Sequence, residues 1–370
     1  HRKTGTIITS NTSGIPIKLM NEGRSDDFKE CFAITHFFNP PRYLNLFEVV
    51  PGPDCKKGIL DFLLDYGEKF LGKTSVLAKD TPAFIGNRIG IFGIMSLFHQ
   101  IKSGEYSVEE VDKLTGPAIG RPKSATFRTA DIAGLDTMCH VANGVYEKCK
   151  DDESREVFKL PDFLQKMLDN NMLGSKTGKG FYKKIKDDNG KSKILALDLN
   201  TFKYNEQKKV SYETLKNARK CKKRDEKFKT LISGNDKASK FYEENFARMF
   251  GYIQNRIPEI SNDITSIDAA LKTGFGWKDG PFEIWNYIGV KEGVELMKKF
   301  DLKPAEWINE MIKKNTNNFY RINDGFREYY DINSNSFNKI AGQDGFVILK
   351  NTPENKVIWS NNEARLIDIG

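Results

Sequence analysis

The chain has 370 residues, of which 39% are hydrophobic and 12% aromatic, enough for more than one packed core, so two or three domains are expected. No apolar stretch reaches membrane-spanning length, and no charged start followed by an apolar run marks a signal peptide. The five cysteines form no C-x-x-C pair, which favours free thiols, a cytoplasmic location and no metal centre.

The formal net charge is +8, a mild basic excess. The Lys and Arg residues are widely spread and no helix-turn-helix or RNP-type motif occurs, so no nucleic-acid partner is expected. Binding of a small ligand that carries phosphates would explain the excess of positive charge equally well.

A polar turn follows the first predicted strand. Thr6–Thr9 has the β-branched residues of a strand and leads into Ser10-Asn11-Thr12-Ser13-Gly14. From the residues alone, this polar cluster is best explained as a capped turn.

The main candidate site combines a histidine and a glutamate on two neighbouring apolar runs. Phe32–Ile34 and Leu46–Val50 are short and bounded by Pro or Gly, as is typical of buried strands in an α/β sheet. His36 lies where the first strand meets a loop, and ligands of open α/β sheets bind at strand ends. Glu48 interrupts the second run, and a buried carboxylate needs a partner. We therefore expect a His36–Glu48 hydrogen bond that leaves one ring nitrogen free to take a proton. Spacing alone leaves a structural core histidine beside a coincidental glutamate equally open.

Helices then alternate with one more strand. Cys55–Leu71 has apolar residues at helical spacing, and Ser75–Leu77 is predicted as the last strand of the α/β unit. A buried helix is predicted over Pro82–Ser103, starting after the capping side chain of Asp80. Asn87 on this helix needs a partner, which is either backbone or a ligand oxygen.

The rest of the chain is predicted to be mainly helical. Ser107 and Glu110 have the spacing of a capping box at a helix start. The polar stretch 187–229 ends in the charged run Lys216–Lys229 and is predicted as a solvated linker and helix face.

An internal repeat is also visible. Five residues of the first helical region, Val111, Asp112, Gly120, Phe127 and Gly134, recur as Ile267, Asp268, Gly276, Phe282 and Gly289. A second helical domain is therefore expected to duplicate the first.

The residues around the candidate site carry a family resemblance. The segment HFFNPP, with Glu48 following His36, resembles the signature of the L-3-hydroxyacyl-CoA dehydrogenases of fatty-acid β-oxidation. Three further blocks agree in order, namely Ser10–Ser13, Asp80–Arg88 and Gly120–Asp136. The resemblance runs from about Thr4 to Tyr182, with a weaker second copy later in the chain.

The resemblance implies a fold of α/β plus all-α type. It is expected to contain the C-terminal half of a Rossmann NAD-binding domain (1–80), a first helical dehydrogenase domain (81–185), a charged linker (186–234), a second helical domain (235–330) and a tail (331–370) leading toward a hydratase domain. No G-x-G-x-x-G motif occurs in the chain. We therefore expect that the first half of the Rossmann domain is missing. The end of the chain, Val357–Gly370, resembles the lead-in to an enoyl-CoA hydratase domain, so the polypeptide is expected to continue past Gly370.

The resemblance also implies roles for individual residues. His36 is the expected general base and Glu48 its partner, while Ser13 and Asn87 position the C3 oxygen of the substrate, with Ser10 as the alternative to Ser13. Asn11, Ser13 and Asn39 are the expected contacts of NAD.

The implied function is NAD-dependent oxidation of L-3-hydroxyacyl-CoA to 3-ketoacyl-CoA, with acyl-CoA as substrate and a homodimer or a thiolase partner as the assembly. An inert CoA-binding or assembly fragment is the alternative. A different NAD-dependent 3-hydroxyacid enzyme is a third reading, against which the HFFNPP segment argues, since such enzymes generally use a lysine. The segment Lys123–Phe127 departs from the family pattern, so the acyl end of the pocket is expected to differ.

Overall fold

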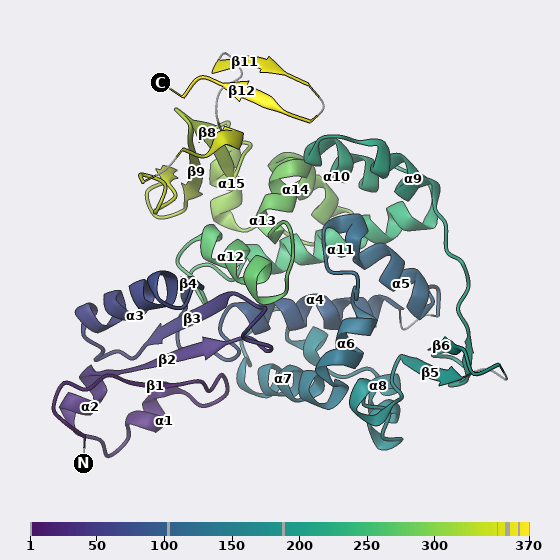
Figure 1. Cartoon of the computed structure of the whole chain (residues 1–370), viewed down its shortest axis with the longest axis horizontal. Helices are drawn as coiled ribbons and strands as arrows, with labels where there is room; N and C mark the ends of the chain where they lie inside the picture. The colour runs from purple at the N-terminus through teal and green to yellow at the C-terminus, as the bar shows by residue number, and fades with distance from the viewer. Residues whose placement is uncertain are drawn as a thin grey trace.

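The computed structural model describes residues 2–101, 104–186, 189–345, 347–351, 356–361 and 363–369. An α/β layer formed by the N-terminal part lies beside a larger helical body, and the C-terminal hairpin lies at the far end of that body (Figure 1). No helix among the described residues is long and apolar enough to cross a membrane.

The α/β layer is a mixed four-stranded sheet. Its strands lie side by side in chain order: β1 (Ile8–Ser10), β2 (Phe32–Phe37), β3 (Leu46–Pro51) and β4 (Thr74–Leu77). Strands β1 and β2 are parallel, β2 and β3 antiparallel, and β3 and β4 parallel. The helices of this layer are α1 (Ile17–Asn21), α2 (Asp26–Glu30) and α3 (Lys57–Lys69). The four predicted strands and the predicted helix after Cys55 are confirmed.

Alternation along β2 and β3 separates two faces. On one face Ala33, Phe47 and Val49 pack against Leu63 of α3. Side chains of a strand alternate between its two faces. The alternate residues of β2 and β3 therefore point toward the helical body, and they include Ile34, His36 and Glu48.

Helix α4 (Gly86–Ile101) connects the sheet to the helical body. The prediction that it starts at Pro82 was wrong, because Ala83 and Phe84 have positive φ angles of 67° and 49° and cannot continue a right-handed helix. Asp80 does not cap α4; its carboxylate accepts a hydrogen bond from the backbone amide of Ile17 at 2.9 Å. The predicted end at Ser103 lies outside the described residues.

The first helical region follows α4. It contains α5 (Val108–Thr115), η1 (Pro117–Ile119), α6 (Phe127–Ala133), α7 (Leu135–Lys148), η2 (Arg155–Phe158), α8 (Asp162–Asp169), η3 (Ser175–Thr177) and the antiparallel sheet of β5 (Tyr182–Lys186), β6 (Ser192–Leu197) and β7 (Tyr204–Glu206). The predicted capping box of Ser107 and Glu110 at the start of α5 is confirmed.

The segment 186–234 was predicted as a solvated linker and helix face; the charged helix face is present, but the segment is more ordered than a linker. It holds β6, β7 and two helices, α9 (Glu213–Lys220) and α10 (Arg224–Ile232). These helices bury apolar side chains at helical spacing, among them Leu215 and Phe228, so the charges cover only their outer faces.

Apart from the 3-10 helices, the later part of the chain has the same element order as α4 and the first helical region taken together. It contains α11 (Lys237–Gln254), α12 (Ile264–Gly274), α13 (Pro281–Ile288), α14 (Val290–Lys298), α15 (Glu306–Lys313) and the antiparallel sheet of β8 (Tyr320–Asn323), β9 (Phe326–Asp331) and β10 (Ser336–Lys339). The expected boundaries at 185 and 330 fall inside β5 and β9, which pair with the strands that follow them. The chain continues through η4 (Leu349–Asn351) to the hairpin of β11 (Val357–Ser360) and β12 (Arg365–Ile367).

Equivalent aspartates make equivalent bonds in the two regions. Asp112 of α5 accepts hydrogen bonds from three backbone amides at the start of α6, at 2.7–3.1 Å, and from the Tyr182 hydroxyl at 2.8 Å. Asp268 of α12 accepts them from two amides at the start of α13, at 2.8 and 3.0 Å, and from the Tyr320 hydroxyl at 2.7 Å. The repeat in the sequence is therefore matched by a repeat of hydrogen bonds, whereas the division into tandem domains stays a prediction.

A buried ionic cluster joins α4 to the later region. The fully buried guanidinium of Arg88 contacts Asp152 at 2.5 Å, Glu259 at 2.9 Å and the Tyr252 hydroxyl at 2.7 Å. Burial alone would lower the pKa of Arg88, but the neighbouring Tyr252 and the carboxylates outweigh burial and hold that pKa above its usual value.

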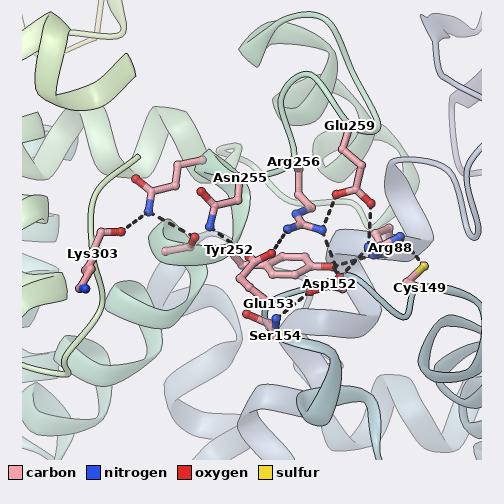
Figure 2. Close-up of polar contacts among 12 residues, drawn as sticks. Arg88, Cys149, Asp152, Glu153, Ser154, Tyr252, Asn255, Arg256, Glu259 and Lys303 are labelled. Carbon is pink, nitrogen blue, oxygen red and sulfur yellow. Dashed lines mark hydrogen bonds and ion pairs between the residues drawn. The ribbon is translucent and has the colours of Figure 1, made fainter. Parts of the chain in front are cut away.

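A second arginine completes the cluster. Arg256 contacts Asp152 at 3.1 Å and Glu259 at 2.5 Å, and it also pairs with Glu153. Figure 2 shows both guanidinium groups converging on Asp152, which is fully buried and comes from the segment between α7 and η2. The cluster therefore fixes the first turns of α4 against two distant segments.

We expect Asp152→Asn to lower the free energy of unfolding by about 3 kcal/mol, because two buried guanidinium groups lose their shared counter-charge. Urea denaturation measures the change. Asp151→Asn is the matched control, since the Asp151 side chain is exposed, and it should change stability by less than about 0.5 kcal/mol. Equal stabilities for the two variants would contradict the assigned role of the cluster.

Candidate active site

His36 and Glu48 are direct cross-strand partners on β2 and β3. The Nδ1 atom of His36 lies 2.7 Å from Oε2 of Glu48, and the two residues are 7% and 0% exposed. Because an ionised carboxylate can only accept, Nδ1 carries the proton and Nε2 keeps its lone pair. The expected contact is present, while the catalytic role of each residue stays a prediction.

The second oxygen of Glu48 is bound by the start of α4. Oε1 accepts hydrogen bonds from the backbone amides of Ile85 at 3.1 Å and Gly86 at 2.8 Å. The left-handed turn at Ala83 and Phe84 aims these amides at the carboxylate, and the positive end of the helix dipole favours the negative charge there. Three donors therefore fix the carboxylate, which in turn fixes the imidazole.

Aromatic rings confine the imidazole. Its centroid lies 5.0 Å from the Phe38 ring and 5.6 Å from the Phe84 ring, both in edge-on orientation. The Phe38 ring fits because residue 86 is glycine; a Cβ atom there would lie 2.6 Å from that ring. The packing holds the ring orientation that the Glu48 bond selects.

A cavity of about 460 Å³ opens beside His36. Asn39 from the loop after β2 and Asn87 from the first turn of α4 line it together with His36. Asn87 is half-buried and lies next to Arg88, so the ionic cluster of Figure 2 holds the helix turn that presents it. Three of the sequence-predicted residues thus share one cavity.

Of the remaining predicted residues, Ser10 is the last residue of β1, and Asn11 and Ser13 lie in the loop after it. The Asn11 side-chain oxygen accepts a hydrogen bond from the backbone amide of Phe37 at 2.9 Å, which ties this loop to the end of β2. Ser13 lines a neighbouring cavity of about 380 Å³ and does not line the cavity of His36. The Ser10 hydroxyl accepts from the amide of Thr12 at 3.3 Å.

Sequence reasoning did not single out the residues that close the far side of the cavity. Arg121 comes from the turn after η1, and Phe275 and Trp277 come from the segment after α12. A hydrogen bond of 2.7 Å from the Lys278 amide to the Gly120 carbonyl joins the two segments. The sequence held one signal for these residues: the internal repeat pairs Gly120 with Gly276, the neighbours of Arg121 and Trp277.

The first helical region, through Arg121, and the later region, through Phe275 and Trp277, therefore line the same cavity. No group of three or more His, Cys, Asp or Glu side chains suited to a metal occurs in the part of the chain that the structure describes.

Two family models match the chain in order. Residues 1–81 match the model described as "3-hydroxyacyl-CoA dehydrogenase, NAD binding domain", and residues 84–184 match "3-hydroxyacyl-CoA dehydrogenase, C-terminal domain". The sheet with His36 and Glu48 falls in the first match, and Asn87 and Arg121 fall in the second.

Curated relatives extend the likeness along the chain. A "Probable 3-hydroxyacyl-CoA dehydrogenase" of Bacillus subtilis is 45% identical over 371 aligned residues, covering 100% of this chain and 46% of the relative. A "Putative fatty acid oxidation complex trifunctional enzyme" of Rickettsia prowazekii is 29% identical, covering 99% of this chain and 46% of the relative. The chain thus spans about half the length of these relatives.

A solved structure supports the fold. The crystal structure of 3-hydroxybutyryl-CoA dehydrogenase from Escherichia coli K12 matches with a TM-score of 0.61 and 17% identity, covering 84% of this chain and 75% of that one. At this identity the likeness concerns the fold alone. The ordered pair of domain matches and the 45% identity along the whole chain carry the assignment, and the chain belongs to the 3-hydroxyacyl-CoA dehydrogenase family of NAD-dependent oxidoreductases.

Proposed function

We propose that this chain carries the general base and the substrate cavity for NAD-dependent oxidation of L-3-hydroxyacyl-CoA to 3-ketoacyl-CoA in fatty-acid β-oxidation. The observation that carries the proposal is the His36–Glu48 pair, braced by the amides of α4 beside a cavity that His36 lines. Fatty-acid oxidation rests on the printed name of the Rickettsia relative.

The proposed step begins with the substrate hydroxyl. Nε2 of His36 takes the proton of the C3 hydroxyl, and Glu48 stabilises the imidazolium that forms. The C–H electron pair at C3 leaves as hydride and the C3–O bond becomes a carbonyl. The Asn87 amide donates to the C3 oxygen and holds the alcohol in the geometry that hydride loss requires.

The polar side chains at the carboxyl ends of β1 and β2 fit the nicotinamide end of NAD. When bound, NAD supplies the hydride acceptor. Strands β1 and β2 are parallel, and the loops after them carry Asn11, Ser13 and Asn39 at the carboxyl ends, where ligands of α/β sheets bind. The Asn11 bond to Phe37 brings the two loops together. We propose these three residues as contacts of the cofactor, with Ser13 also reaching the C3 oxygen.

The inert-fragment alternative is not favoured. Residues 1–81 match the NAD-binding domain of the family, and the His36–Glu48 pair is fully assembled within them. An acyl-CoA substrate, a homodimer or a thiolase partner, and a cytoplasmic location complete the proposal. They rest on the family and on its bacterial members.

We expect His36→Gln to lower kcat by roughly 10²–10⁴, because glutamine cannot accept the hydroxyl proton. NADH absorbance with a 3-hydroxyacyl-CoA measures the rate. Near-normal turnover would refute the assignment of His36 as the base.

Glu48→Gln tests the role of the pair. Glutamine can still accept from Ile85 and Gly86 through Oε1, but its NH₂ group then faces Nδ1 and drives the ring proton to Nε2, so kcat should fall by about 10⁴. Glu30→Gln, which alters only a surface ion pair with Lys56, is the control and should leave the rate unchanged. An unaltered rate and pH profile in Glu48→Gln would contradict the proposed tautomer control.

Asn87→Ala should lower kcat by about 10²–10³ while the melting temperature stays close to wild type. The Asn87 side chain has no hydrogen bond to another described residue, so its loss removes only the donor to the substrate. Asn170→Ala, at the end of α8, is the matched control on an exposed helix end. A normal kcat, or a loss explained by unfolding, would contradict the positioning role.

A further inference from the structure

Arg121 is a half-buried cation that lacks a counter-charge among the described residues. Its guanidinium carbon lies over the Trp277 ring, 3.9 Å from the ring centre. The Nε atom is buried and has no hydrogen-bond partner, and no carboxylate among the described residues forms a salt bridge with the side chain. The side chain also lines the cavity of His36.

The buried Nε atom without a hydrogen-bond partner costs folding free energy. Removing a charged group from water is unfavourable unless an opposite charge and hydrogen bonds replace the water. Burial lowers the pKa of Arg121 to about 10, so the group still carries its charge at neutral pH. A site that keeps a cation in this state is suited to an anion that arrives with a ligand.

Neighbouring groups do not supply that anion. Asp279, on the adjoining segment, is paired with Arg224. The Thr129 hydroxyl donates to the Ala125 carbonyl at 2.6 Å, and the Thr126 hydroxyl donates to Thr115 at 2.8 Å. Arg121 is therefore the one charged group that the cavity lining presents without a partner among the described residues.

The backbone holds the guanidinium in place. Gly120 has a φ of +77° in the turn before Arg121, and its carbonyl accepts the Lys278 amide at 2.7 Å. This bond fixes the distance between the turn and Trp277. A planar guanidinium held against a ring offers its N–H groups in a fork, the geometry that matches a carboxylate.

An apolar path separates Arg121 from the base. The rings of Phe38 and Phe275 lie 5.8 Å apart, and those of Phe275 and Trp277 lie 6.4 Å apart, so three rings connect His36 to the guanidinium. Along another wall, the lining of α4 from Asn87 to Ile94 extends about 10 Å at 1.5 Å per residue. The cavity is thus lined by apolar side chains, with His36 as the proposed base in one part of the lining and Arg121 as the cation in another.

We propose that Arg121 and Trp277 recognise a carboxylate at the far end of the acyl chain, so that the substrates include 3-hydroxyacyl-CoA thioesters of dicarboxylic acids. This inference rests on the proposed function, whose alcohol would sit at His36. The acyl methylenes lie along the rings, and the terminal carboxylate pairs with the guanidinium.

Paired ligands of equal chain length test the proposal by calorimetry on the whole chain. Adipyl-CoA ends in a carboxylate and hexanoyl-CoA ends in a methyl group, and neither has a 3-hydroxyl to be oxidised. We expect the wild-type chain to bind adipyl-CoA roughly 10- to 100-fold more tightly. Arg121→Met should abolish or reverse this preference, and Arg121→Lys, which keeps the charge without the fork, should reduce it to a few-fold.

Lys123→Met is the matched control. Lys123 is an exposed cation of the same turn but lines a different cleft, so the preference should persist in this variant. Melting temperatures identify any variant that fails to fold, in which case Arg121→Lys carries the comparison.

Two outcomes would overturn the proposal. One is equal affinity of the wild-type chain for both ligands. The other is an equal loss of both ligands in Arg121→Met, which would assign the guanidinium to a phosphate of CoA. If adipyl-CoA is preferred but 3-hydroxyadipyl-CoA yields no NADH, the carboxylate site stands and the proposed dehydrogenase function fails.

Discussion

The carboxylate of Glu48 is the group on which the site depends. A buried charge is tolerated only when its oxygens are occupied by donors, and here one oxygen takes the His36 ring and the other takes two amides of α4. This requirement fixes the register of β2 and β3, because a slip of one strand by one residue would turn its side chain of the pair to the α3 face and break the contact. It also accounts for the left-handed turn before α4, since a helix that began at Pro82 would not aim the amides of Ile85 and Gly86 at the carboxylate.

Helix α4 lies between two buried ionic systems. Its first amides bind Glu48, and two residues later Arg88 enters the cluster with Asp152 and Glu259 (Figure 2). Asn87 lies between them, so its direction is determined from both sides. The later region of the chain contributes Tyr252 and Arg256 to this cluster and Phe275 and Trp277 to the cavity. It is therefore part of the site as well as a repeat of the first helical region.

The sequence predicted what depends on local pattern. The buried strands and the capping box at Ser107 followed from residue types and spacing, and the contact of His36 with Glu48 followed from these together with the family resemblance. The start of α4 was mispredicted because a tertiary demand, the carboxylate of Glu48, overrides the helix signal of Asp80 and Pro82. The charged helix face in the segment 186–234 was predicted, but the linker part was misread because the count of charges hid apolar residues at helical spacing in α9 and α10. The Arg88 cluster joins residues far apart in the chain, which no local pattern encodes.

Three arginines, two of them buried and one half-buried, show where folding and function separate. Arg88 and Arg256 each contact two or more carboxylates, so their charges are balanced within the fold. Arg121 is only half-buried, its guanidinium lies over a Trp ring, and it has no carboxylate partner among the described residues. A fold that can balance two guanidinium groups could have balanced the third with one acidic side chain. Arg121 instead lines the cavity of His36, and such a local inconsistency is expected where a site binds a ligand. The segment that follows Arg121, Lys123–Phe127, is also where the sequence departs from the family pattern.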